Sequence, residues 1–118
     1  MRVAIKRIYD VVETTDGKRI LVDRLWPRGV TKERAHLDLW LKEIAPSPTL
    51  RQAFAHQAAH WLMFQNKYYQ ELADNSHVAE LREMATHEKI TLLYAAKDPK
   101  INHALVLKNY LLGNPIES

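Results

Sequence analysis

The sequence has no cysteine and only three glycines among its 118 residues. Without cysteine it forms no disulfide, offers no thiolate nucleophile and has no thiolate ligand for a metal. No apolar run approaches the ~20 residues of a membrane-spanning helix. The first residues, from Met1 to Arg7, hold too short an apolar stretch for a signal peptide. We therefore expect a cytoplasmic protein that does not enter a membrane.

What is present fits one domain over residues 1–118. Hydrophobic residues make up 47% of the chain and charged residues 26%, which is typical of a soluble domain with a core. Short apolar runs alternate with longer amphipathic segments in the second half. This alternation predicts an α/β fold, in which a small, mostly parallel sheet is flanked by helices.

Periodicity and capping residues place the elements. We expect strands at 3–8, 19–23 and 90–95, a short extended segment at 37–41, and helices at 48–56, 58–74, 77–87 and 99–112. Ser47-Pro48 and Asp98-Pro99 both combine an N-cap residue with a proline suited to the first helical position. Only ten residues separate the first two strands, which is short for a parallel crossover, so an antiparallel hairpin stays open as an alternative.

The first of the candidate functional segments runs from Asp23 to Lys32. It leaves the buried run Ile20-Leu21-Val22 and carries Arg24, Trp26 and Arg28 on a loop that Pro27 and Gly29 keep irregular. Loops held by a rigid sheet commonly carry binding residues. This loop is therefore the first place to expect a site.

Positive charge is concentrated in the same part of the chain. Residues 1–34 hold nine Lys and Arg against five Asp and Glu, while the remaining residues hold eight against nine. Proteins that bind long nucleic acids usually carry larger basic clusters. The balance therefore favours a small anion as the ligand, and a nucleic-acid-binding or regulatory module is the alternative.

If the strands at 19–23 and 90–95 run parallel, their carboxyl ends lie at one edge of the sheet, where open α/β sheets bind ligands. Guanidinium groups and a helix N-terminus are both suited to oxyanions. The residues that would meet there are Arg24, Trp26 and Arg28 from one strand exit and Lys97, Asp98, Asn102 and His103 from the other.

Several of these residues also have purely structural interpretations. Asp98 next to a proline is more typical of a helix cap than of a catalyst. Arg24 has Asp23 and Asp38 as candidate ion-pair partners. His56 and His60 stand four apart, but no third ligand accompanies them, so we expect surface histidines and no metal site. His103 is a candidate general acid or base because histidine titrates near neutral pH.

The motifs resemble those of a known family. The matching residues are Asp23 to Gly29, Lys32, Asp38, Trp40, Ala45 to Ser47, Leu50, Arg51, His56, Trp61, Phe64, Tyr68, Glu71, Leu72, Ala96 to Asp98 and Asn102 to Ala104. They are similar to the signature of the YeaO-like proteins, catalogued as domain of unknown function 488. The resemblance implies an α/β domain with parallel first strands joined by a helical crossover. It supplies no established activity, and Asn102-His103-Ala104 stands where wider relatives have Cys-His-Arg.

The combined prediction is a pocket for a phosphate, nucleotide or carboxylate, without a cofactor. The predicted ligand-binding residues are Arg24, Trp26, Arg28, Lys32, Asp38, Arg51 and Asn102. His103 and Asp98 are the candidate catalytic residues. The pattern does not decide between a binding protein and an enzyme.

Overall fold

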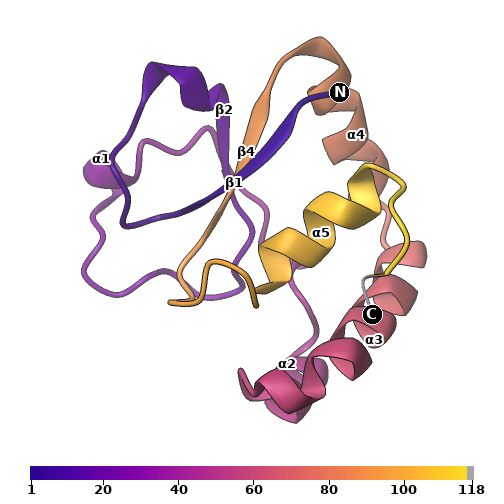
Figure 1. Cartoon of the computed structure of the whole chain (residues 1–118). Helices are drawn as coiled ribbons and strands as arrows, with labels where there is room; N and C mark the ends of the chain where they lie inside the picture. The colour runs from indigo at the N-terminus through magenta and orange to yellow at the C-terminus, as the bar shows by residue number, and fades with distance from the viewer. Residues whose placement is uncertain (117–118) are drawn as a thin grey trace.

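Four parallel strands form the centre of the computed structural model, which describes residues 1–116 (Figure 1). Their order in the sheet is β1-β4-β2-β3. The strands are β1 (Val3–Arg7), β2 (Lys18–Leu21), β3 (Leu39–Trp40) and β4 (Ile90–Tyr94). Every pairing is parallel, so the predicted α/β class is confirmed.

The antiparallel hairpin considered for β1 and β2 is wrong, because β4 lies between them. Ile90 is in register with Val3 on one side and with Lys18 on the other. The crossover implied by the family resemblance is parallel but not helical. Residues 8–17 form a loop with one 3-10 turn, η1 (Thr14–Asp16). Ten extended residues reach ~33 Å, which is enough to return along so short a strand.

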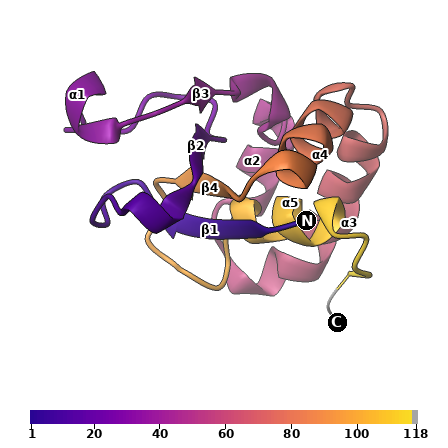
Figure 2. The ribbon, with the colours of Figure 1, turned by 90° about the horizontal axis from the view of Figure 1, so that it is seen from above.

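Helices cover the two faces of the sheet unequally, as Figure 2 shows from above. The helical segments are α1 (Lys32–Ala35), η2 (Lys42–Ile44), α2 (Pro48–Phe54), η3 (Ala58–His60), α3 (Trp61–Ala73), α4 (His77–His87) and α5 (His103–Leu111). The main core places Ile20, Val22 and Leu92 against α2 to α5. Leu21 and Leu93 alternate to the opposite face and pack near α1. Within residues 1–116 no helix has the length and apolar character needed to cross a membrane.

The last helix begins later than predicted. Asp98 Oδ1 accepts from the backbone N–H groups of Lys100 and Ile101, at 2.8 and 3.1 Å, and so caps a separate turn. Asn102 is the N-cap of α5, with its Oδ1 2.8 Å from Leu105 N. Both residues have a side chain suited to capping, and the predicted start at Pro99 is wrong because Asn102, not Asp98, caps α5. The other predicted cap, Ser47, is confirmed by its bond from Leu50 N.

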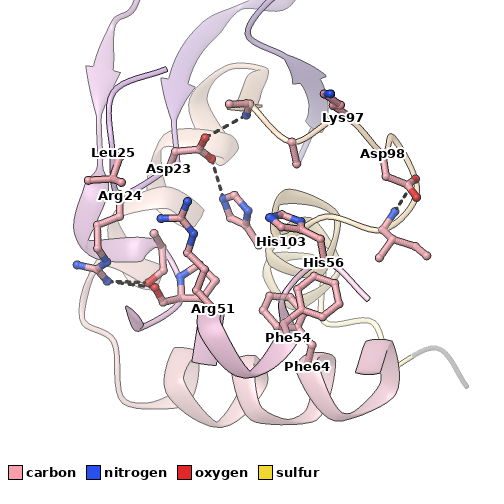
Figure 3. A pocket seen from close by; sticks show the side chains of 15 residues that line it. Asp23, Arg24, Leu25, Arg51, Phe54, His56, Phe64, Lys97, Asp98 and His103 are labelled. Atoms are coloured by element: carbon pink, nitrogen blue, oxygen red, sulfur yellow. Dashed lines mark hydrogen bonds and ion pairs between the residues drawn. The ribbon is translucent and has the colours of Figure 1, made fainter. Parts of the chain in front are cut away.

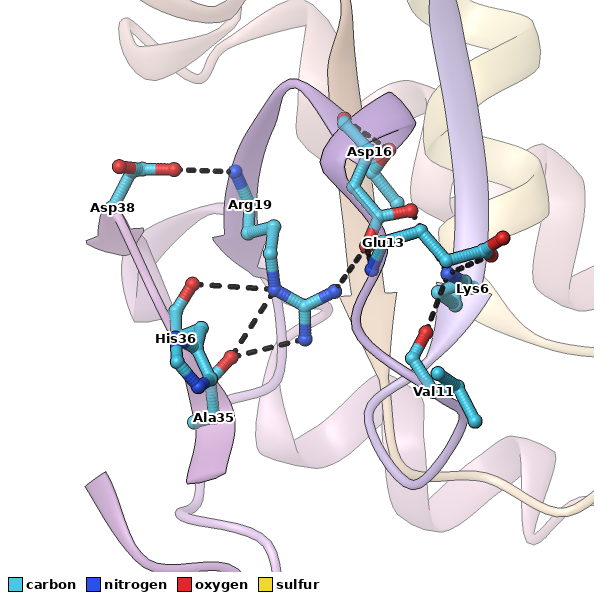
Figure 4. A network of polar contacts seen from close by, with 9 residues as sticks. Lys6, Val11, Glu13, Asp16, Arg19, Ala35, His36 and Asp38 are labelled. Carbon is cyan, nitrogen blue, oxygen red and sulfur yellow. Dashed lines mark hydrogen bonds and ion pairs between the residues drawn. The ribbon is translucent and has the colours of Figure 1, made fainter. Parts of the chain in front are cut away.

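A buried polar network joins β1, η1, β2 and α1 (Figure 4). The Arg19 guanidinium donates to Asp16 Oδ2 and, at 2.9 Å, to the Ala35 carbonyl oxygen. Lys6 Nζ lies 2.8 Å from the other oxygen of Asp16 and 2.7 Å from Glu13 Oε1. Burying charges is costly unless each is paired and hydrogen-bonded, and here they are. The basic residues Lys6 and Arg19 are therefore structural.

Candidate functional site

A cavity of about 470 Å³ opens at the carboxyl ends of β2 and β4 (Figure 3). This volume lies within the usual range for small-molecule sites. The cavity lies where parallel α/β sheets bind their ligands. Its lining consists of Asp23, Arg24, Leu25, Ala45, Pro46, Arg51, Phe54, His56, Phe64, Ala95, Ala96, Lys97, Asp98, Ile101 and His103. The segment leaving β2 and the start of α5 thus meet, as the parallel arrangement predicted.

At the inner end of the cavity, Asp23 faces His103. Asp23 Oδ2 accepts from Ala95 N at 3.0 Å, and His103 Nε2 lies 3.0 Å from both Asp23 Oδ1 and the carbonyl oxygen of Val22. Both of these neighbours accept hydrogen bonds, so Nε2 carries a hydrogen. That hydrogen is directed at Val22, and Asp23 Oδ1 is buried without a hydrogen bond of its own among the described residues. Nδ1 is the ring atom left to face a ligand.

Arg51 enters the cavity from α2. Ser47 caps this helix, and Glu71 on α3 holds the cap in place, accepting from the Ser47 backbone N–H at 2.9 Å and from its hydroxyl at 2.6 Å. One turn later the Arg51 side chain points into the cavity toward Asp23 (Figure 3). No hydrogen bond or ion pair within the described part of the chain engages its guanidinium, which makes Arg51 a free cation in the cavity.

Arg24 has a different role in the same wall. Its Nη2 donates to the carbonyl oxygens of Ala45 and Pro46, at 3.1 and 3.4 Å, and its Nε is buried without a partner among residues 1–116. The ion pairs with Asp23 or Asp38 considered from the sequence do not form. Arg24 therefore fixes the segment that leads into α2, and its charge stays close to the cavity.

His56 is a cavity residue that the sequence interpretation missed. It follows Ala55, and both have left-handed backbones, with φ of 55° and 48°. Such conformations are uncommon for residues other than glycine and cluster at functional sites. The turn brings the His56 ring over Phe54, with ring centroids 5.7 Å apart, and into the cavity (Figure 3). The sequence interpretation expected a surface histidine here and did not place His56 in the site.

Five predicted ligand-binding residues lie outside the cavity. Trp26 packs edge-on against Trp40 at 5.3 Å, on the α1 face of the sheet. Arg28 and Lys32 are exposed there as well. Asp38 accepts from the backbone N–H of Arg19 at 2.8 Å, and Asn102 is 1% exposed as the cap of α5. The structure therefore brings together Arg24, Arg51, Asp98 and His103 from the predicted set.

Among the described residues no group of three or more His, Asp or Glu side chains is arranged to hold a metal ion. The charged groups that line the cavity are three cations, Arg24, Arg51 and Lys97, and two carboxylates, Asp23 and Asp98. Both carboxylates already accept hydrogen bonds from backbone N–H groups. Because the three cations outnumber the two carboxylates, the formal charge of the lining is positive.

Comparison with known proteins identifies the class. Residues 2–117 match the family model described as "Inactive DUF488-N3 subclade". The chain is 46% identical to Uncharacterized protein YeaO from Escherichia coli, over 94% of this chain and 97% of that protein. It is 37% identical to Uncharacterized protein Mb3100c from Mycobacterium bovis and Uncharacterized protein Rv3073c from Mycobacterium tuberculosis, over 95% of each chain. No solved structure matches. The chain belongs to the DUF488 family, among its YeaO-like members.

Proposed function

We propose that the cavity binds a small anionic molecule that carries a phosphate or carboxylate group. The observation that carries this proposal is the Arg51 guanidinium, which points into the cavity without a partner in the described part of the chain. A guanidinium offers a planar fork of donors suited to both anions. The three cations of the cavity lining outnumber its two carboxylates, Asp23 and Asp98, so the formal charge around Arg51 is positive.

The other lining residues support the same role. Lys97 is exposed at the cavity and adds a positive charge. Arg24 is held by two carbonyl oxygens and contributes its charge at a fixed position. His56 and His103 offer ring nitrogens for hydrogen bonds to the ligand. In this arrangement Arg51 makes the direct contact, and the remaining cations strengthen the positive potential around it.

Binding without turnover is the better-supported form of this function. The matched subclade is described as inactive, and the chain has no thiol to act as a nucleophile. The residues suited to acid–base chemistry are Asp23 and His103, because Asp23 Oδ1 and His103 Nε2 lie 3.0 Å apart in the cavity wall. His103 Nδ1 is the atom through which a proton would pass if a substrate reached it.

A thermal-shift screen of phosphates, nucleotides and carboxylates tests the proposal. A ligand at one hundred times its dissociation constant stabilises the folded protein by about 2.7 kcal/mol. We expect Arg51→Gln to lose this protection. The matched control is Arg34→Gln, which removes the same charge from an exposed position on α1 outside the cavity. Protection of Arg51→Gln equal to that of the wild type, or no protection of any form, would refute the proposal.

The nucleic-acid alternative rested on the basic residues of the first third, and several of these are engaged by the protein. Lys6 pairs with Asp16, and Arg19 is buried beside it. Arg7 donates to the carbonyl oxygens of Ala95 and Ala96. The alternative stays a prediction, and binding to single-stranded DNA that weakens steeply with salt would support it.

A further inference from the structure

The walls around Arg51 are largely apolar. Phe54 and Phe64 stack with their centroids 4.3 Å apart at one side of the cavity, and Ile101 lines it next to the start of α5. Leu25 lines the cavity from the segment that leaves β2 and is 63% exposed. An apolar side chain of this size in a ligand cavity gains free energy when a ligand covers it, since burial removes its surface from water.

A second hollow continues the cavity past Arg51. It is lined by Arg24, Leu25, Pro48, Arg51, Gln52 and His56. Four of these residues also line the main cavity, so Arg51 and Leu25 stand where the two hollows join. The free guanidinium is therefore bordered by the apolar side chains of Leu25 and Pro48 as well as by polar neighbours.

We infer that the ligand is an amphipathic organic anion, in which a carboxylate or phosphate is attached to an apolar or aromatic group. This inference rests on the proposed function and names the chemical class of its ligand. The charged group lies against Arg51, and the apolar group covers Leu25 and extends toward Phe54. A bare inorganic anion would meet the guanidinium but would leave the exposed apolar surface of Leu25 in contact with water.

Calorimetric titration of matched ligand pairs tests this class. The pairs are phosphate with phenyl phosphate, acetate with phenylacetate, and ribose 5-phosphate with adenosine monophosphate. In each pair both members carry the same charged group, and only one carries an aromatic ring. We expect the aromatic member of at least one pair to bind at least tenfold more tightly, which is 1.4 kcal/mol. Its heat-capacity change on binding should also be more negative, because apolar surface is buried.

Two leucine variants locate the apolar contact. Leu25→Gln should reduce the preference for the aromatic member at least threefold while the affinity for the parent anion stays within twofold. Leu62→Gln is the matched control, because Leu62 is 50% exposed on α3 and lies outside both hollows. Leu25 is exposed, so its replacement should leave the fold intact, and the circular dichroism spectrum checks this.

The outcomes distinguish the amphipathic ligand class from the proposed anion-binding function on which it rests. Equal binding of both members in every pair overturns the amphipathic class and leaves the anion pocket standing. Failure of every ligand to bind overturns both. An aromatic preference that Leu25→Gln retains in full also overturns the inference, because the apolar group then lies elsewhere.

Discussion

His103 Nε2 lies 3.0 Å from Asp23 Oδ1, and this contact joins the first residue of α5 to the segment that leaves β2. The same nitrogen is 3.0 Å from the carbonyl oxygen of Val22. The pair thus fixes two walls of the cavity relative to each other. The shape of the cavity therefore depends on the contact between α5 and the segment that leaves β2.

Replacing His103 by alanine should lower the free energy of unfolding by about 1–3 kcal/mol, because the Val22 carbonyl then loses its donor in a largely buried position. Urea denaturation measures the change. His87→Ala is the control, since His87 pairs with Glu83 at 2.8 Å but both side chains are 73% exposed. A loss for His103→Ala no larger than for His87→Ala would contradict a bracing role.

The Asp16 network makes the free energy of unfolding depend on pH. Burial opposes ionisation of Asp16, but hydrogen bonds from Lys6, the Glu13 backbone and Arg19 outweigh it and lower the pKa of Asp16 below its usual 3.8. The stabilisation is therefore complete above about pH 4 and is lost as pH falls through the lower folded-state pKa. Denaturation curves between pH 2 and 7 should show this loss in the wild type and a weaker dependence in Asp16→Asn.

At pH 7, Asp16→Asn should itself cost about 3 kcal/mol, because the buried Arg19 guanidinium loses its counter-charge. Glu13→Gln removes the other carboxylate near Lys6, but that side chain is largely exposed, and we expect a cost below about 1 kcal/mol. Equal costs for the two variants would mean that burial does not govern the network.

Gly17 should tolerate no side chain. Its φ is 65°, and a Cβ there would collide with the backbone carbonyl of Lys89. We expect Gly17→Ala to lower the free energy of unfolding by about 3 kcal/mol or more. Gly113 has φ of 75° with open space around it, so Gly113→Ala should cost only the ~1–2 kcal/mol of a left-handed backbone. Thermal unfolding that ranks the two variants in the opposite order would refute this.

Relief of backbone strain at Ala55 should stabilise the protein. Ala55 is exposed with φ of 48°, and glycine adopts this conformation without the Cβ clash. Ala55→Gly should raise the free energy of unfolding by about 0.5–1 kcal/mol. Ala53→Gly, in α2 two residues earlier, should instead lower it by about as much. A loss of stability in both variants would show that Ala55 is not strained.

The sequence predicted those elements whose signals are local. Ile90 to Tyr94 is an apolar run that suits a buried parallel strand, and all five residues are buried. Ser47-Pro48 supplied both a cap and a first helical residue, and α2 begins there. The parallel order also placed Arg24 and His103 at one edge of the sheet, which is the basis of the site.

The remaining site features depend on tertiary structure. Trp26 and Arg28 follow Arg24 closely, but the chain turns to the opposite face of the sheet, where Trp26 packs on Trp40. The sequence suggested Arg24 as the partner of Asp23, whereas the structure places Asp23 against His103, which is distant in sequence. His56 reaches the cavity because two consecutive residues, Ala55 and His56, have left-handed backbones. This turn was not predicted from the sequence.

The central position of β4 has a consequence for synthesis of the chain. Val3 and Lys18 both pair with Ile90, so β1 and β2 cannot join in one sheet until β4 has left the ribosome. Before that, β1 and β2 present unpaired edges, and pairings so distant in sequence form slowly. A nascent chain halted before β4 should be digested readily by proteases, whereas one halted after α5 has emerged should resist them.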